Sequence, residues 1–297
     1  MGTIVIAQLC QGKFASIEVE GMKTGSAKIR RGVYLLPNAF TTGALFAGFF
    51  AIISGINGRF IPAAVAIVVA ALLDALDGRV ARLTHTETDF GVQYDSLSDL
   101  VSFGLAPALL AFNWSLSGLG QLSPLAGKLG WLAAFVFVAC AALRLARFNT
   151  QAKVADRRYF QGLPSPAAAV TLAATIWFLA DYGVPGQSVG WLMWTETVFL
   201  GLLMFSRVRY VSGKGWPRGD RIPAGWVFAI VLTIVLLAIH PQTVLMLCGL
   251  IYVFSGLAIT VMGRREWRAR RMKRLRRRKG SRAGDGDAEE DARGGDA

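Results

Sequence analysis

Four aspartates form two pairs whose spacing would place each pair on one side of a helix. Asp74 and Asp77 are three residues apart, and Asp95 and Asp99 are four apart; residues at these separations are neighbours on a helix surface. A short polar segment connects the pairs, so their helices should run antiparallel, with the four carboxylates converging at one depth. Oxygen ligands without histidine or cysteine suit hard cations such as Mg²⁺ or Mn²⁺. The spacing therefore predicts a site for divalent metal ions.

Small residues and an arginine accompany these acids. Gly78, Ala81 and Gly91 lie within a turn or so of the aspartates, and glycine is unfavourable in a helix interior unless a close approach requires it. Arg82 is one turn beyond Gly78, where its guanidinium would reach phosphate oxygens. The combination predicts a metal site beside a groove that fits a nucleotide diphosphate.

The elements that position these residues are long apolar segments. The chain has 297 residues, of which 54% are hydrophobic, and roughly 20 helical residues cross a bilayer. We expect about eight spans, at approximately 33–53, 60–80, 92–112, 129–148, 165–182, 191–209, 223–239 and 242–262. The apolar runs do not alternate with period two, so helices are expected rather than a barrel. The fold class predicted is an all-α polytopic membrane protein, a bundle of about eight transmembrane helices.

The basic residues predict an orientation. With the N-terminus inside, the expected outer segments contain Arg59 and Lys128, whereas the other arginines and lysines fall inside. Cytoplasmic loops are enriched in these residues. We therefore expect a multi-pass protein of the inner cell membrane, with both termini in the cytoplasm and the active site facing the cytoplasm.

Three regions follow from this layout. Residues 1–32 would form an N-terminal cytoplasmic or juxtamembrane segment, residues 33–262 the transmembrane domain, and residues 263–297 a basic and then acidic disordered tail. The formal net charge is +13, but the cations lie at the ends of apolar helices. Membrane lipids are the expected partner and nucleic acid is not.

The acidic stretch matches the motif of a known family. Its fixed positions are Asp74-x-x-Asp77-Gly78-x-x-Ala81-Arg82, then eight residues, then Gly91-x-x-x-Asp95-x-x-x-Asp99. This pattern resembles the CDP-alcohol phosphotransferase family at every fixed position. The segment LLPNAFTTGALFAGF is similar to the first helix of that family, where Asn38 and Thr41 match polar positions near the nucleotide.

The resemblance implies roles for these residues. Asp74, Asp77 and Asp95 would be metal ligands for two divalent ions, and Asp99 would contact metal and act as general base. The residues that would hold the CDP portion are Gly78, Ala81, Arg82, Gly91, Asn38 and Thr41. The family resemblance also implies a homodimer.

Two further stretches resemble one branch of the family, the integral-membrane phosphatidylserine synthases. They are DSLSDLVSFGLAP at 95–107 and RLARFNT...YFQGLPSPAAA at 144–169. This likeness implies transfer of a phosphatidyl group from CDP-diacylglycerol to L-serine, with release of CMP.

Serine would need a cation for its carboxylate. Arg144 and Arg147 are one turn apart and are followed by Asn149; they would face one cavity, or else form an ordinary positive-inside pair. Ser165 would line the acceptor pocket or cap the helix that begins there. Lys153 is a further candidate for a phosphate contact.

Other interpretations stay open from the sequence alone. The acceptor alcohol could be glycerol 3-phosphate, an inositol phosphate or a choline-type alcohol. An intramembrane prenyltransferase also uses aspartates and Mg²⁺, but the Gly-x-x-Ala-Arg spacing disfavours it. A cation transporter is disfavoured by Arg82 beside the acids. Finally, Arg79 and Arg82 could neutralise the acids as purely structural ion pairs.

Overall fold

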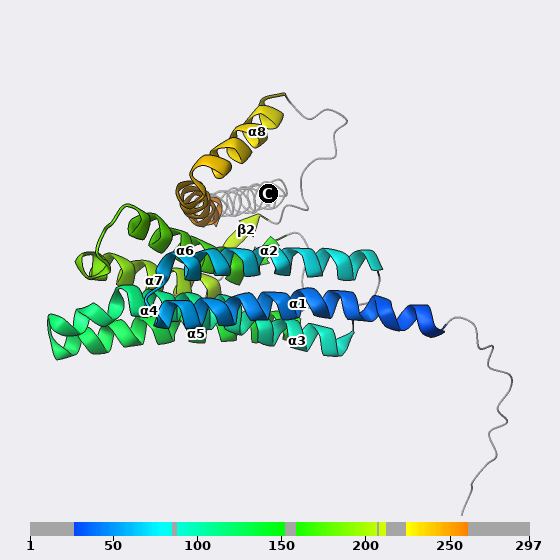
Figure 1. The fold of residues 1–297 in the computed structure, drawn as a ribbon, viewed down its shortest axis with the longest axis horizontal. Helices are drawn as coiled ribbons and strands as arrows, with labels where there is room; N and C mark the ends of the chain where they lie inside the picture. Colours follow the sequence, from blue (N-terminus) through cyan, green and yellow to red (C-terminus); the bar gives the residue numbers. More distant parts are fainter. Residues whose placement is uncertain (1–26, 85–87, 152–158, 207, 212–223, 261–297) are drawn as a thin grey trace, which may run out of the picture.

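The computed structural model describes residues 27–84, 88–151, 159–206, 208–211 and 224–260, and helices lie side by side in it (Figure 1). The first membrane segments are α1 (Ala27–Ile56) and α2 (Phe60–Thr84). The third consists of α3 (Asp89–Asp99), a π-helix (Leu100–Leu105) and α4 (Ala106–Trp114) in direct succession. The helices α5 (Pro124–Gln151), α6 (Ser165–Asp181), α7 (Gly190–Phe205) and α8 (Ala224–Ile239) follow, and then a last helix, Pro241–Thr260. Short 3₁₀ turns, Leu116–Gln121 and Gly186–Val189, precede α5 and α7.

The helical membrane protein predicted from the sequence is confirmed. In the described part of the chain, six helical segments are long and apolar enough to cross a membrane: Asn38–Ile56, Phe60–Val80, Phe90–Trp114, Pro124–Thr150, Gly186–Phe205 and Pro241–Thr260. Helices α6 and α8 coincide with the two other predicted spans but have 17 and 16 residues, fewer than the roughly 20 that a bilayer requires. The count of eight crossings therefore stays a prediction. Helix α1 already begins at Ala27, and the tail 263–297 lies outside the described residues.

A tight turn joins α1 to α2. The amide of Arg59 donates to the carbonyl of Ser54 at 2.8 Å, closing the end of α1. Gly58 between the helices has φ +72, a left-handed conformation that glycine adopts without penalty. The two helices therefore run antiparallel, and the acidic end of α2 lies far from this turn.

Small residues let α1 and α2 approach closely. Ala44 and Ala51 on α1, and Ala63 and Ala70 on α2, are buried. Helices in membranes associate through such small side chains, because lipid offers little hydrophobic drive for association. The contact fixes α2, and with it the first pair of aspartates.

A second contact fixes the third membrane segment to α1. The hydroxyl of Ser98 donates to the carbonyl of Thr41 at 3.1 Å, and that of Ser102 donates to the carbonyl of Ala44 at 3.0 Å. Gly48 lies opposite Ser102: a Cβ at this position would be 2.7 Å from the Cα of Ser102. The backbones of α1 and the π-helix therefore touch directly, one turn from Asp99.

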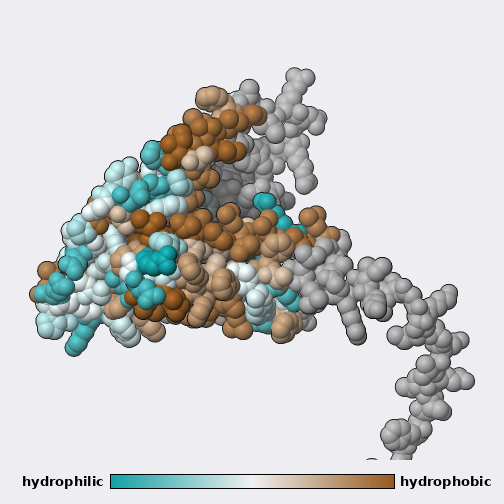
Figure 2. Space-filling view, viewed as in Figure 1, coloured by the Kyte–Doolittle hydropathy of each residue, from teal (hydrophilic) through white to brown (hydrophobic). Residues whose placement is uncertain are grey.

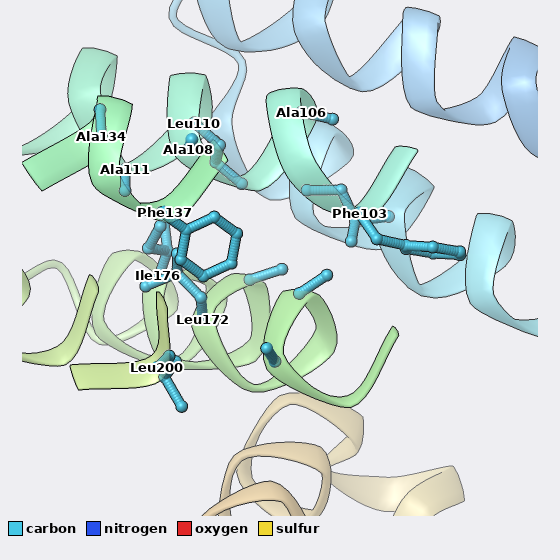
Figure 3. Packing of buried hydrophobic residues seen from close by; sticks show 14 of the residues in the cluster. Phe103, Ala106, Ala108, Leu110, Ala111, Ala134, Phe137, Leu172, Ile176 and Leu200 are labelled. Atoms are coloured by element: carbon cyan, nitrogen blue, oxygen red, sulfur yellow. The ribbon is translucent and has the colours of Figure 1, made fainter. Parts of the chain in front are cut away.

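Larger apolar side chains fill the space between α4, α5, α6 and α7 (Figure 3). Leu110 on α4, Phe137 on α5, and Leu172 and Ile176 on α6 are fully or almost fully buried. On the outside, Figure 2 shows apolar residues across the bundle and along α8, which extends away from the other helices. A helix that is apolar all round, as α8 is, suits a lipid environment.

A ribbon of two strands lies at the start of α6 and the end of α7. Its first strand precedes α6 in the chain, and its second strand follows α7. β1 (Tyr159–Gln161) pairs antiparallel with β2 (Arg209–Val211). Gly162 then turns with φ +86, and a Cβ there would collide with the carbonyl oxygen of Met204 at the end of α7. The amide of Leu163 donates to the carbonyl of Leu203 at 3.1 Å. The start of α6 is thereby held against the end of α7.

We expect Gly48→Ala to destabilise the protein, because the added methyl group would overlap Ser102 and force α1 away from the π-helix. Overpacking of this kind costs about 1–3 kcal/mol. The measurement is thermal unfolding of the purified protein in detergent. Gly225→Ala on α8 is the matched control, since a Cβ there meets nothing within 4 Å. Equal melting of the two variants would contradict the proposed close contact.

Candidate active site

Three carboxylates meet between α2 and α3. Asp74, Asp95 and Asp99 each offer a carboxylate oxygen, and these atoms all lie within 4.8 Å of one another. All three side chains are partly buried. The arrangement arises because α2 ends where α3 begins, so residues near the two helix ends share one depth.

The fourth acid, Asp77, lies beside this group and is almost completely buried. Its Oδ2 accepts a hydrogen bond from Oγ1 of Thr41 on α1 at 2.8 Å. Its charge interacts with those of Asp95 and Asp99. Thr41 therefore orients an acid of the site, in addition to the nucleotide contact that the sequence predicts for it.

Arg144 on α5 brings a positive charge to the acids. Its guanidinium interacts electrostatically with Asp74 and Asp99, and its Nη1 donates to Oγ of Ser165 at 2.8 Å. Its Nε is buried and has no hydrogen-bond partner among the described residues. A buried guanidinium donor without an acceptor is costly, so this nitrogen is suited to a ligand that carries an acceptor oxygen.

Ser165 does not cap α6. The helix begins without a side-chain cap, with Pro164 at the N-cap position. Two roles are predicted for Ser165, lining the acceptor pocket or capping α6. Capping is wrong, because its hydroxyl accepts from Arg144 instead. Gly162 and the ribbon before it hold Ser165 at this position.

Two of the other predicted acceptor residues, Asn149 and Arg147, lie on α5 within the described part of the chain. Nδ2 of Asn149 donates to Oγ of Ser96 on α3 at 3.0 Å, so α5 and α3 are linked at the same end of the bundle. Arg147 lies one turn beyond Arg144, and its carbonyl accepts from Oγ1 of Thr150 at 3.0 Å. Lys153 lies outside the described residues.

The predicted nucleotide residues lie around the same helix ends. Asn38 comes near Gly91, since a Cβ on Gly91 would be 3.8 Å from Oδ1 of Asn38. The amide of Gly91 donates to Oγ1 of Thr88, which caps α3. Gly78 lies within α2, and its backbone amide hydrogen-bonds Asp77.

The backbone at positions 81 and 82 is also within α2, and the side chains of Ala81 and Arg82 lie outside the described part. Arg79 is exposed. The structural alternative pairs Arg79 and Arg82 with the acids, and it stays a prediction because the side chain of Arg82 is outside the described part. Among the described residues, Arg144 interacts electrostatically with Asp74 and Asp99.

The acids fit divalent metal ions. The three carboxylate oxygens are close enough for one ion to bind several of them, and oxygen donors suit Mg²⁺ or Mn²⁺. Carboxylates at this separation repel one another strongly in a partly buried site. Asp74, Asp95 and Asp99, with Asp77 beside them, would hold such ions, whose charge offsets that repulsion.

A π-helix begins directly after Asp99. π-Helical segments are rare in proteins, and those that occur are frequently found at functional sites. They change the phase of the helix by one residue. Here Ser102 within it bonds α1, while Asp95 and Asp99 before it face Asp74. The sequence carries no signal that we recognised for this feature.

The segment that carries these residues is similar to known proteins. A sequence model of the family described as CDP-alcohol phosphatidyltransferase matches residues 34–203. The CDP-diacylglycerol–serine O-phosphatidyltransferase of Helicobacter pylori (strain ATCC 700392 / 26695) is 37% identical over 182 residues, 61% of this chain and 74% of that protein. The enzyme of the same name from Methanocaldococcus jannaschii is 35% identical over 212 residues, 71% and 90% of the two chains. The archaetidylserine synthase of Methanothermobacter thermautotrophicus is 33% identical over 184 residues, 61% and 72%.

We expect Thr41→Val to weaken metal binding, because Asp77 loses the hydrogen bond that orients its carboxylate. A hydrogen bond to a charged group contributes about 1.5–3 kcal/mol, so the dissociation constant for Mn²⁺ should rise about tenfold or more. Isothermal titration with Mn²⁺ measures it. Thr195→Val is the control, since its hydroxyl bonds its own helix at Trp191; an unchanged constant in Thr41→Val would contradict the role of Thr41.

Proposed function

Because the chain belongs to the CDP-alcohol phosphatidyltransferase family, we propose that it transfers a phosphatidyl group from CDP-diacylglycerol to L-serine, forming phosphatidylserine and CMP. The observation that carries this proposal is the placement of Arg144, which interacts electrostatically with Asp74 and Asp99 and whose buried Nε has no hydrogen-bond partner among the residues that the structure describes. The similar proteins of Helicobacter pylori and Methanocaldococcus jannaschii are named for transfer to serine. Membership of this family also argues against the two alternatives, an intramembrane prenyltransferase and a cation transporter.

The family generally uses a divalent metal, and the Asp cluster has the donors for it. We propose two Mg²⁺ or Mn²⁺ ions, held by Asp74, Asp77, Asp95 and Asp99. When bound, the ions neutralise the charge on the diphosphate and on the CMP that leaves. The CDP portion would lie along the small residues of α2 and α3 and against Arg82.

Asp99 is the proposed general base. The serine hydroxyl is a weak nucleophile at neutral pH, and a base within hydrogen-bond reach must take its proton. As the oxygen–phosphorus bond to serine forms, the bond from phosphorus to CMP breaks, and the proton passes to the carboxylate of Asp99. Asp99 interacts electrostatically with Arg144, so an alcohol bound at Arg144 would be near the proposed base.

Arg144 is proposed to bind the carboxylate of serine. A guanidinium pairs with a carboxylate through several N–H donors, and Nε of Arg144 is a buried donor without a partner in the described ranges. Ser165, which accepts from Nη1, fixes the orientation of the guanidinium. Holding the acceptor this way aligns its hydroxyl for reaction.

The orientation in the membrane is also a proposal. Arg59 lies in the turn between α1 and α2, and Lys128 lies near the start of α5, so both are at the opposite end of their helices from the acids. This supports a site at the cytoplasmic face of the inner membrane, with both termini inside. The homodimer implied by the family resemblance is kept as part of the proposal.

The experiment that tests the function is CMP release. Purified protein receives CDP-diacylglycerol, Mg²⁺ or Mn²⁺, and one alcohol at a time: L-serine, glycerol 3-phosphate, an inositol phosphate or choline. We expect release with L-serine. Release with another alcohol alone would move the acceptor, and no release with any of them would contradict the proposed activity.

Asp99→Asn should lose about 10²–10⁴-fold in kcat, because the amide cannot accept the hydroxyl proton. Binding of CDP-diacylglycerol should change far less. The measurements are kcat and the dissociation constant of CDP-diacylglycerol. Glu196→Gln is the matched control: Oε1 of Glu196 accepts from Thr175 on α6 at 2.8 Å, and an amide oxygen preserves that bond. Near wild-type turnover in Asp99→Asn would rule out the base role.

A further inference from the structure

The last helix lies along α6 and runs opposite to it. Nε2 of Gln242 donates to Oδ2 of Asp181, at the end of α6, with a distance of 2.7 Å. A Cβ on Gly249 would collide with Oγ1 of Thr171, in the middle of α6. The last helix therefore approaches the Ser165 end of α6 as its residue numbers rise.

Tyr210 on β2 fixes the part of the last helix that reaches this end. A Cβ on Gly256 would collide with the ring of Tyr210. The hydroxyl of Tyr210 donates to the carbonyl of Val253 at 3.3 Å. Burial, with a smaller contribution from nearby Tyr252, raises the pKa of Tyr210 to about 12. The phenol is therefore protonated at neutral pH and remains a donor.

Tyr252 is the residue that this arrangement brings to Arg144. It comes three residues after Gly249 and four before Gly256, so it shares the face of the helix that packs inward. Its ring lies 5.3 Å from that of Tyr210, centroid to centroid. Its hydroxyl interacts electrostatically with Arg144. A half-buried phenol is thus near enough to interact electrostatically with the guanidinium of Arg144, whose Nε has no hydrogen-bond partner within the described part of the chain.

Tyr252 lies outside the segment of the chain that the family model matches. The family match covers residues 34–203 and includes all four acids and Arg144, whereas Tyr210 and Tyr252 lie beyond it. A residue outside the common segment but beside the acceptor cation is suited to distinguish one alcohol from another.

We propose that Tyr252 is a specificity-determining residue for the acceptor. Its hydroxyl donates to the carboxylate that Arg144 binds, and its ring, supported by Tyr210, forms one wall of the acceptor pocket. The pocket so bounded suits a small alcohol that carries a carboxylate. This inference rests on the proposed function and deepens it.

Tyr252→Phe tests the inference while preserving the ring contact with Tyr210. We expect the KM for L-serine to rise about tenfold, the effect of losing a hydrogen bond to a charged group, while kcat and the KM for CDP-diacylglycerol stay close to wild type. A merely structural effect would instead move both KM values. Tyr182→Phe is the control, since Tyr182 is exposed at the far end of α6 and contacts Phe178.

The outcomes separate the two proposals. If wild-type protein releases CMP with L-serine and Tyr252→Phe has an unchanged serine KM, or raises both KM values alike, the role of Tyr252 is wrong and the function stands. If wild-type protein does not release CMP with L-serine, the proposed function fails and the role of Tyr252 fails with it. A rise in the serine KM alone supports both.

Discussion

The repulsion among carboxylates in a partly buried site is the constraint on which the rest of the molecule depends. Asp74, Asp95 and Asp99 bring oxygens within 4.8 Å of one another, and the low dielectric of a membrane protein strengthens the repulsion. Cations placed among the acids would offset this repulsion. Arg144 supplies one positive charge, and the family generally uses a divalent metal, which would supply more. The proposed diphosphate substrate has the same requirement, since metal ions held by these acids would offset its charge as well.

Close helix packing holds the acids against this repulsion. Small residues bring α1 to α2, and Gly48 brings α1 to the π-helix after Asp99. Thr41 on α1 bonds Asp77 directly, so one helix positions both acidic pairs. Side-chain and backbone contacts of this kind stabilise helix association in membranes, where apolar burial contributes little. Helix α1, which contributes no acid to the site, thus helps to set the distance between the acids.

The sequence predicted the parts of the site that depend on local spacing. Helical periodicity and a short connection suffice to bring Asp74 near Asp95 and Asp99, because both pairs lie close to helix ends. Contacts between segments that are far apart in the sequence cannot be predicted from helical periodicity and short connections. The bond between Arg144 and Ser165 depends on a ribbon that pairs residues about 50 positions apart. The position of Tyr252 depends on how the last helix packs against α6. The pattern in the sequence that indicates this packing is a row of polar and small residues at seven-residue intervals, Gln242, Gly249 and Gly256. The π-helix had no sequence pattern that we could use, and helix length left the crossings of α6 and α8 undecided.

The central claim is that the four aspartates are a two-ion metal centre, and anomalous scattering from crystals of the full chain grown with Mn²⁺ tests it most directly. Two manganese peaks are expected among the carboxylates of Asp74, Asp77, Asp95 and Asp99. The absence of manganese there, with the guanidinium of Arg144 paired directly with Asp74 and Asp99 instead, would contradict a two-ion centre.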